Sequence, residues 1–143
     1  MHFKTKTFEQ LSTVELYEIL KARVNVFVVE QNCPYPELDE MDYKSLHVWT
    51  EKDGKIVAYL RAHIKDEGVV RMGRVLTTER GKAYGAAILQ HGLKEIKTHF
   101  NPQKIYIEAQ SYAIGFYERE GFAVCSEEFL EDGIPHVQME LEL

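Results

Sequence analysis

The stretch Val69–Leu89, VVRMGRVLTTERGKAYGAAIL, predicts a strand that turns sharply into a helix. Residues 69–77 are rich in valine and other strand formers, whereas residues 83–99 carry apolar side chains at helical spacing. Glycines, small alanines and two cations lie where the period changes, so backbone N–H groups can approach an anion at the positive end of the helix dipole. The stretch therefore predicts a diphosphate site, and an ordinary turn with solvated charges is the alternative.

The glycine turn, Arg80-Gly81-Lys82-Ala83-Tyr84-Gly85, fits neither the P-loop pattern nor the dinucleotide pattern Gly-x-Gly-x-x-Gly. It resembles the acyl-CoA loop of the GNAT acetyltransferase superfamily, in which Gln/Arg-x-x-Gly-x-Gly/Ala follows a central strand. Arg80 and Gly85 match the first and last positions of that loop. Ala83 departs from the pattern, because it stands where the inner glycine is usual.

The composition predicts one domain, residues 1–143, because a chain with 45% apolar and 11% aromatic residues can bury a core without a metal or a disulfide. Cys33 and Cys125 lie far apart and form no Cys-x-x-Cys pair, which favours a reduced intracellular protein. The N-terminus lacks the apolar core of a signal peptide, and the run Val26–Val29 is far too short to span a bilayer. We therefore expect a cytoplasmic protein with no membrane partner.

The chain has 17 basic and 23 acidic residues, a net charge of −6, and its sequence contains no cluster of lysine or arginine. We expect no nucleic-acid partner on this ground. An acidic surface suits a cationic or amine-bearing substrate instead. The six histidines show no ligand spacing, so no metal is predicted. Monomer and homodimer both stay open.

The N-terminal part predicts a strand over residues 3–8 and then a helix that begins with a capping box at Ser12 and Glu15. This helix ends near Arg23 or continues to about Val26. The following segment, RVNVFVVEQNCPY with acidic residues after it, resembles the start of the ElaA-type branch of the GNAT superfamily. It is also faintly similar to acyl-homoserine-lactone synthases.

Residues 31–46 predict a long loop of the kind that often acts as a functional lid. We expect Arg23 and Glu30 to pair across the helix end, and the acidic loop to select cationic amines. A structural ion-pair network is an equally good interpretation of these charges. The candidate substrate-binding residues are Arg23, Glu30, Asp39, Asp42 and His136.

The rest of the chain predicts an α/β fold. A hairpin around Asp53-Gly54 precedes the 69–77 strand, and the central helix ends before Asn101-Pro102. Residues 104–110 then form a strand parallel to 69–77, because a strand–helix–strand crossover lies in one sheet. A short helix stops at Gly121, and the tail supplies two more strands.

Two further motifs resemble the same superfamily. Phe116-Tyr117-Glu118-x-x-Gly121-Phe122 is complete, and the ending Glu-Asp-Gly-Ile-Pro-His-x-x-Met over residues 131–139 again resembles the ElaA-type branch. The resemblance implies a mixed sheet of six to seven strands, with helices on both faces and a splayed acyl-CoA site. It implies cofactor binding by Gly73, Val75, Arg80, Gly81, Lys82, Ala83, Tyr84, Gly85 and Ala86.

The implied chemistry is transfer of an acetyl group from acetyl-CoA to an amine on a small molecule or peptide. The Val75 N–H would polarise the thioester carbonyl, and Tyr117 would protonate the departing thiolate. A core aromatic role is the alternative for Tyr117. The candidate bases are Glu108, then His136 and Glu30. Two other functions stay open: a synthase of the acyl-homoserine-lactone type, and a non-catalytic acyl-CoA-binding module.

Overall fold

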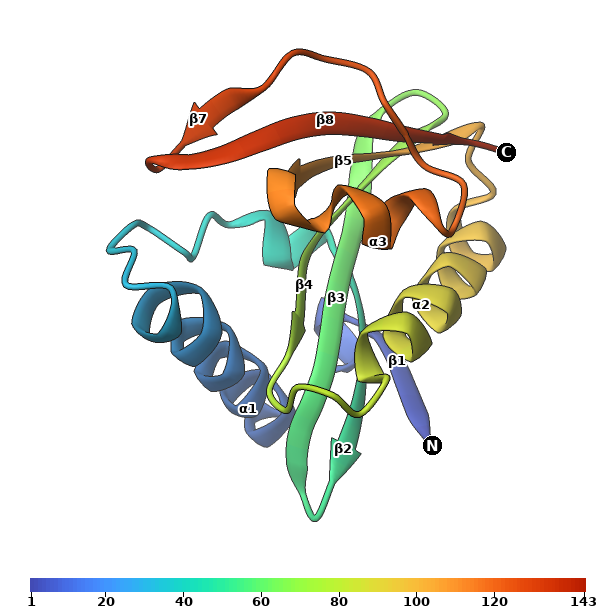
Figure 1. Cartoon of the computed structure of the whole chain (residues 1–143). Helices are drawn as coiled ribbons and strands as arrows, with labels where there is room; N and C mark the ends of the chain where they lie inside the picture. The colour runs from blue at the N-terminus through green and yellow to red at the C-terminus, as the bar shows by residue number, and fades with distance from the viewer.

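The computed structural model describes residues 1–143, and a single eight-stranded sheet runs through it in the order β1-β2-β3-β4-β5-β8-β6, with β7 also pairing with β8 (Figure 1). The mixed sheet and helix arrangement confirm the predicted α/β fold class. The strands are β1 (Phe3–Thr7), β2 (Leu46–Lys52), β3 (Lys55–Asp66), β4 (Val69–Thr77), β5 (Lys104–Gln110), β6 (Ala123–Val124), β7 (Phe129–Glu131) and β8 (Ile134–Glu142).

The first half of the sheet is antiparallel, as the turn chemistry predicts. β1 pairs with β2, and β2–β3–β4 form a meander. Asp53 and Gly54 both have positive φ, 55° and 76°, which is the backbone that a two-residue hairpin turn requires. The predicted hairpin is confirmed.

The two halves of the sheet meet along only three residue pairs. β4 and β5 are parallel, as predicted, and pair from Val69 with Lys104 to Arg71 with Tyr106. β5 then pairs with β8 along its whole length, while the rest of β4 keeps only β3 as a partner. Beyond Arg71 the sheet is therefore open between β4 and β5.

A bulge interrupts β4 where the sheet opens. Gly73 lies opposite Arg61 and Leu76 lies opposite Tyr59, so two residues of β4, Arg74 and Val75, face one residue of β3. Arg74 has a φ of 55°, a left-handed conformation that is uncommon for a residue with a side chain. The sequence pattern did not predict this bulge.

Helices cover both faces of the sheet, which confirms the predicted layering (Figure 1). The helix α2 (Tyr84–Phe100) packs Ile88, Leu89 and Ile96 into the larger core cluster, and α1 (Thr13–Arg23) packs Ile19 and Ala22 into a second cluster with Trp49, Tyr59 and Leu76. Gly92 brings α2 close to β3: a Cβ there would lie 2.4 Å from Leu60.

Three boundaries differ from the prediction. The α-helix ends at Arg23, the first of the two predicted ends, but the chain stays helical beyond Val26 as a π-helical segment, η2 (Val24–Glu30). The short helix α3 (Ile114–Glu118) is preceded by the 3₁₀ turn η4 (Ser111–Ala113). The tail contains three strands instead of two, because β7 forms a hairpin with β8, and the sheet therefore has eight strands. No helix is long and apolar enough to cross a membrane.

Candidate functional site

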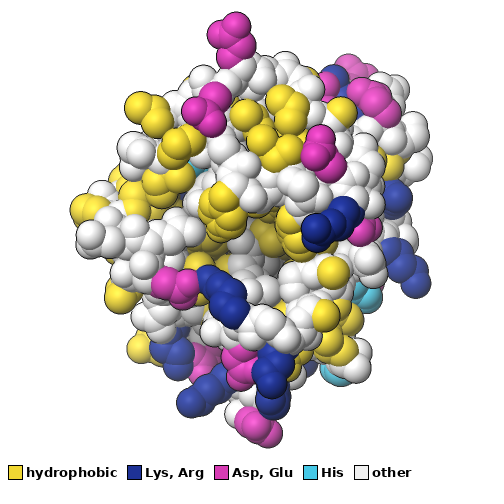
Figure 2. All heavy atoms as spheres, in the orientation of Figure 1, with side chains coloured by type: hydrophobic (Ala, Val, Ile, Leu, Met, Phe, Trp, Pro, Cys, Tyr) yellow, Lys and Arg dark blue, Asp and Glu magenta, His cyan; other side chains and the backbone are white.

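A cavity of about 820 Å³ lies where β4 and β5 separate. Its walls come from both strands, from α3, from the loop after η2 and from the β7–β8 turn. Figure 2 shows its mouth as a hollow near the centre of this face, with basic side chains nearby. The opening in the sheet thus leads to backbone groups that no neighbouring strand covers.

The β4 side of the cavity is formed by Gly73, Arg74 and Val75. A Cβ built on Gly73 would have no atom within 4 Å, so this strand segment is open to another extended chain. The bulge at Arg74 changes the direction of the backbone just before Val75. These residues, predicted from the sequence as binding residues, therefore lie where an extended ligand could pair with the strand.

The turn between β4 and α2 has a left-handed backbone at two positions. Gly81 and Ala83 both have positive φ, 72° and 58°. Glycine is usual at the position of Ala83 because a residue with a side chain disfavours this left-handed conformation. No side chain caps α2 and no acidic residue lies in its first turn, so the free N–H groups at its start remain available.

The predicted binding residues of this turn occupy two places. Arg80 and Gly85 line the cavity, while Gly81, Lys82, Ala83, Tyr84 and Ala86 lie in the turn and the first turn of α2. Arg80 donates hydrogen bonds to the Thr77 carbonyl oxygen at 2.6 Å and to its Oγ1 at 3.0 Å. A Cβ on Gly85 would lie 3.3 Å from Phe116, so this glycine lets α3 approach α2.

Tyr117 of α3 lines the cavity from the same face of the sheet that α2 covers. Its ring packs edge-on against Phe116 and Phe122, with centroid distances of 5.0 and 5.8 Å, and contacts the larger core cluster. Its hydroxyl makes no hydrogen bond to the protein and is not sealed from solvent. Burial of the ring raises the pKa of Tyr117, so the phenol keeps its proton at neutral pH.

A polar row from β5 and β8 lines the opposite side. Glu108 and Gln110 alternate along β5, and Gln110 pairs across the sheet with His136 of β8. The two oxygens of Glu108 are engaged: Oε2 accepts a hydrogen bond from the Tyr106 hydroxyl at 2.6 Å, and Oε1 lies 3.2 Å from the Arg71 guanidinium. Burial, followed by this hydrogen bond, raises the pKa of Tyr106.

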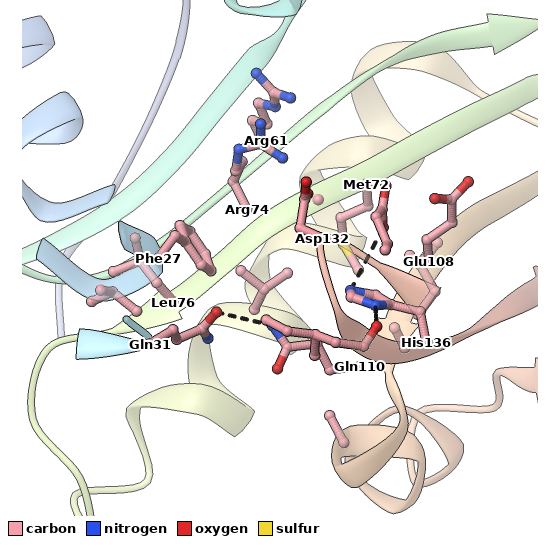
Figure 3. A pocket seen from close by; sticks show the side chains of 18 of the residues that line it. Phe27, Gln31, Arg61, Met72, Arg74, Leu76, Glu108, Gln110, Asp132 and His136 are labelled. Atoms are coloured by element: carbon pink, nitrogen blue, oxygen red, sulfur yellow. Dashed lines mark hydrogen bonds and ion pairs between the residues drawn. The ribbon is translucent and has the colours of Figure 1, made fainter. Parts of the chain in front are cut away.

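His136 is almost fully buried in this wall, with 8% of its surface exposed. Its Nδ1 lies 2.7 Å from the Ile134 carbonyl oxygen, and its Nε2 lies 3.6 Å from a carboxylate oxygen of Glu131 (Figure 3). The ring stacks on Phe129 with a centroid distance of 6.0 Å. Because a carbonyl oxygen can only accept, Nδ1 carries a proton and Nε2 has the free lone pair when the ring is neutral.

Two contacts close the cavity beside this wall. The Gln110 side-chain amide donates a hydrogen bond to Gln31 at 3.2 Å, joining β5 to the loop after η2 (Figure 3). The Cys33 thiol lies 3.6 Å from the Asp132 carbonyl oxygen, joining the same loop to the β7–β8 turn. The predicted lid loop therefore lies over the cavity and contacts its far side.

The loop is held by an ion-pair network of six residues: Arg23, Glu37, Asp39, Asp42, Arg61 and Arg74. Arg23 is fully buried, with its Nε 3.0 Å from Glu37 and an NH group 2.5 Å from Asp42. Arg61 pairs with both aspartates, at 2.5 Å from Asp39 and 3.0 Å from Asp42. Arg74 of the bulge pairs with Glu37.

These pairs decide the charge of the loop. Burial works to raise the pKa of Asp39, but the Arg61 guanidinium outweighs it and holds that pKa well below its usual range. The pKa of Asp42 is lowered in the same way, against burial, by Arg23 and Arg61. The predicted acidic loop is thus ionised and already paired with arginines of the same chain.

The predicted pair between Arg23 and Glu30 is wrong. Glu30 lies at the end of η2 and pairs with Arg80, because the π-helical segment carries it away from Arg23 and toward the β4–α2 turn. Of the predicted substrate-binding residues, Asp39 and His136 line the cavity, Arg23 and Asp42 lie behind its wall, and Glu30 lies outside it.

Several residues of the site were missed by the sequence analysis. Arg74 and Glu131 carry no spacing signal, because their partners are distant in the sequence, and Glu37 stood out only as one acid of the loop. Arg61 has a signal, because it alternates with apolar residues along its strand. That alternation placed Arg61 on the correct side without identifying its partners.

The comparisons with known proteins agree with this geometry. A family model described as an acetyltransferase (GNAT) domain matches residues 10–143. The chain is 44% identical to a UPF0039 protein of Schizosaccharomyces pombe, over 100% of this chain and 98% of that protein. It is 36% identical to protein ElaA of Escherichia coli, over 94% of this chain and 92% of that protein.

Solved structures show the same similarity. The crystal structure of Escherichia coli ElaA matches with a TM-score of 0.94 and 34% identity, covering 99% of this chain and 100% of that one. An acyl-CoA N-acyltransferase from Pseudomonas aeruginosa matches with a TM-score of 0.93 and 34% identity, covering 99% of each chain.

Proposed function

The chain belongs to the GNAT acetyltransferase family, and we propose that it transfers an acetyl group from acetyl-CoA to an amine by direct attack of the amine on the thioester. The observation that carries this proposal is the opening between β4 and β5, with a bulge on one edge and an uncapped helix start beside it. The acceptor is an amine on a small molecule or a peptide.

The residues present fit the pantetheine arm of acetyl-CoA. Amide groups of an extended ligand can pair with an unpaired strand edge as an added strand does. Gly73 leaves the space for it, since its Cβ position is free of neighbours. The diphosphate then faces the N–H groups of residues 81–86, which no protein side chain caps.

The mechanism uses groups from the strand edge and from α3. In this proposal the N–H of Val75, the second residue of the bulge, donates a hydrogen bond to the thioester oxygen as negative charge develops on it. Tyr117 carries a proton at neutral pH, as a tyrosine phenol ordinarily does, and its hydroxyl is free of protein partners. It can therefore protonate the thiolate as the C–S bond breaks.

An acetyl-CoA turnover assay over a panel of amines tests the proposal, with calorimetry of CoA binding beside it. We expect CoA binding and amine-dependent release of free thiol, with the amide identified by mass spectrometry. CoA binding without turnover of any amine would favour the non-catalytic module. A lactone product in place of an amide would favour the synthase of the acyl-homoserine-lactone type.

A further inference from the structure

One nitrogen in the cavity wall has no hydrogen-bond partner although its residue is more than nine-tenths buried. His136 is 8% exposed, and its Nδ1 is held by the Ile134 carbonyl oxygen at 2.7 Å. That contact fixes the ring orientation and leaves the lone pair on Nε2, which has no protein donor. The residue lines the cavity, so the lone pair is available to a ligand there.

The other candidate proton acceptors are occupied. Glu108 accepts the Tyr106 hydroxyl on one oxygen and pairs with Arg71 on the other. Glu30 lies outside the cavity wall and pairs with Arg80. Among the three bases that the sequence suggested, only His136 both lines the cavity and keeps an acceptor atom without a protein hydrogen bond, with the Glu131 carboxylate 3.6 Å from it.

The position of His136 also suits the direction of the reaction. It lies on the polar face of the β5–β8 pair, opposite Gln110, whereas Tyr117 packs with the apolar residues on the other face. An amine that attacks from the polar face would expel the thiolate toward the face of Tyr117. The proton acceptor and the proton donor would then stand on opposite sides of the reacting carbon.

Charges near His136 indicate the class of acceptor. Two carboxylates on this side of the cavity, Glu131 and Asp132, belong to the β7–β8 hairpin. The other charged groups are Glu108 of β5 and Arg71 of β4, which form an ion pair with each other. Asp132 forms no ion pair, and Glu131 has only the histidine, 3.6 Å away. No arginine or lysine neutralises these two carboxylates, so they can attract a cation, unlike those of the lid loop, which pair with arginines.

We propose that the acceptor enters as an alkylammonium ion at the corner formed by Glu131, Asp132 and His136, and that Nε2 of His136 removes its proton. Glu131 is a positioning residue that stabilises the imidazolium formed. The inference rests on the proposed N-acetyltransferase function. The neutral amine then attacks the thioester carbon, and the electron pair of the broken C–S bond leaves with sulfur. The adduct loses its second N–H proton to water, Tyr117 gives its proton to the thiolate and is reprotonated from water, and His136 returns the first proton to solvent. One proton is therefore released for each amide formed.

The test compares His136→Asn with the wild type, because the asparagine amide can keep the donor to the Ile134 carbonyl while the proton acceptor is lost. With a primary alkylamine, kcat/KM should fall by about 10²–10⁴-fold, as is typical for loss of a general base. With a weakly basic amine such as methoxyamine, which is already neutral at pH 7, the loss should be much smaller. An equal loss with both amines would overturn the proposal.

Glu131→Gln adds a readout that a structural role would not change. With a primary alkylamine, Glu131→Gln should raise KM, because a carboxylate that attracts the ammonium ion is lost, while the KM for methoxyamine should stay at the wild-type value. The exposed residue Glu127, which forms no ion pair and lies off the cavity, provides the matched control Glu127→Gln, whose KM values should equal those of the wild type. KM values of Glu131→Gln identical to those of the control would contradict the role of Glu131.

The wild-type assay separates this inference from the proposed function. If the wild type acetylates no amine, the proposed function fails before any variant is compared. If it acetylates amines and His136→Asn matches it with both acceptors, only the assignment of His136 and its corner fails. Calorimetry of CoA binding by His136→Asn should give the wild-type Kd, which shows that the fold and the donor site are intact.

Discussion

From the end of β4 through the turn into α2, residues 73–86 present mainly backbone groups, while residues 37–42 and Arg61 present side chains that are already paired with one another. We call the first the backbone side and the second the ion-pair side. The backbone side depends on small residues and positive φ angles, which leave N–H groups uncovered. The ion-pair side depends on six charged residues that are far apart in the sequence. The first is suited to bind a ligand, and the second to hold a loop in place.

The ion-pair side also reaches the backbone side through one residue. Arg74 is the bulged residue of β4, and its guanidinium pairs with Glu37 of the loop, which also pairs with the buried Arg23. The loop therefore contacts the strand at the residue before Val75. Substitutions on each side test its role separately, because each can be measured for its effect on catalysis, on folding and on binding of the acyl donor.

The largest expected effect is on catalysis, from Tyr117→Phe. The ring and its packing against Phe116 and Phe122 remain, while the proton for the thiolate is lost. We expect kcat to fall by about 10²–10⁴-fold with little change in the melting temperature or in CoA affinity. A donor with a better leaving thiol should reduce the loss. The neighbouring phenol provides the control Tyr112→Phe; if that variant loses the activity instead, Tyr112 is the acid.

A large loss of stability is expected from Arg23→Met on the ion-pair side. Glu37 and Asp42 would lose a fully buried guanidinium at 3.0 and 2.5 Å, and breaking a buried pair typically costs about 3–5 kcal/mol. Urea unfolding should show this decrease. Lys21→Met, which breaks an exposed pair with Glu18, should leave the free energy of unfolding nearly unchanged. Similar losses for the two variants would mean that the buried network does not hold the loop.

A smaller effect on binding is expected from Gly73→Val on the backbone side. A Cβ at Gly73 meets no protein atom, so we expect little change in the free energy of unfolding, while the valine side chain would obstruct a donor arm that pairs with β4. We expect the Kd for CoA to rise by about tenfold or more, about 1.4 kcal/mol. Calorimetry measures it. Gly115→Ala, also free of neighbours but outside the cavity wall, should leave the Kd unchanged; an unchanged Kd in Gly73→Val as well would place the donor elsewhere.

The smallest effect is a gain in stability from Ala83→Gly. Ala83 has a φ of 58°, where a side chain costs about 1–2 kcal/mol and glycine costs less. The free energy of unfolding should rise by about 0.5–1 kcal/mol in a denaturant titration. The same replacement at Ala86, in the right-handed first turn of α2, should lower it by about 0.5–1 kcal/mol. A loss at both positions would contradict the strain at Ala83.

The sequence alone determined the elements and their order where local chemistry sets them. The capping box at Ser12, the turn at Asp53-Gly54 and the end of α2 before Pro102 are confirmed, because each depends on residues that are neighbours in the chain. The strand–turn–helix of residues 69–89 is confirmed for the same reason. The roles of Tyr117, Val75 and the glycine turn stay predictions that the sequence made through a family resemblance.

Only the tertiary structure decided which charges meet. The sequence paired Arg23 with Glu30, seven residues away, whereas Arg23 pairs with Glu37 and Asp42 and Glu30 pairs with Arg80. No sequence pattern predicted the bulge at Arg74 or the ring nitrogen of His136 that lacks a protein hydrogen bond. A long side chain can reach many partners, and the strand register, the π-helical segment and burial together determine which one is close enough. Those distances come from the packing of the whole sheet, so no local pattern contains them.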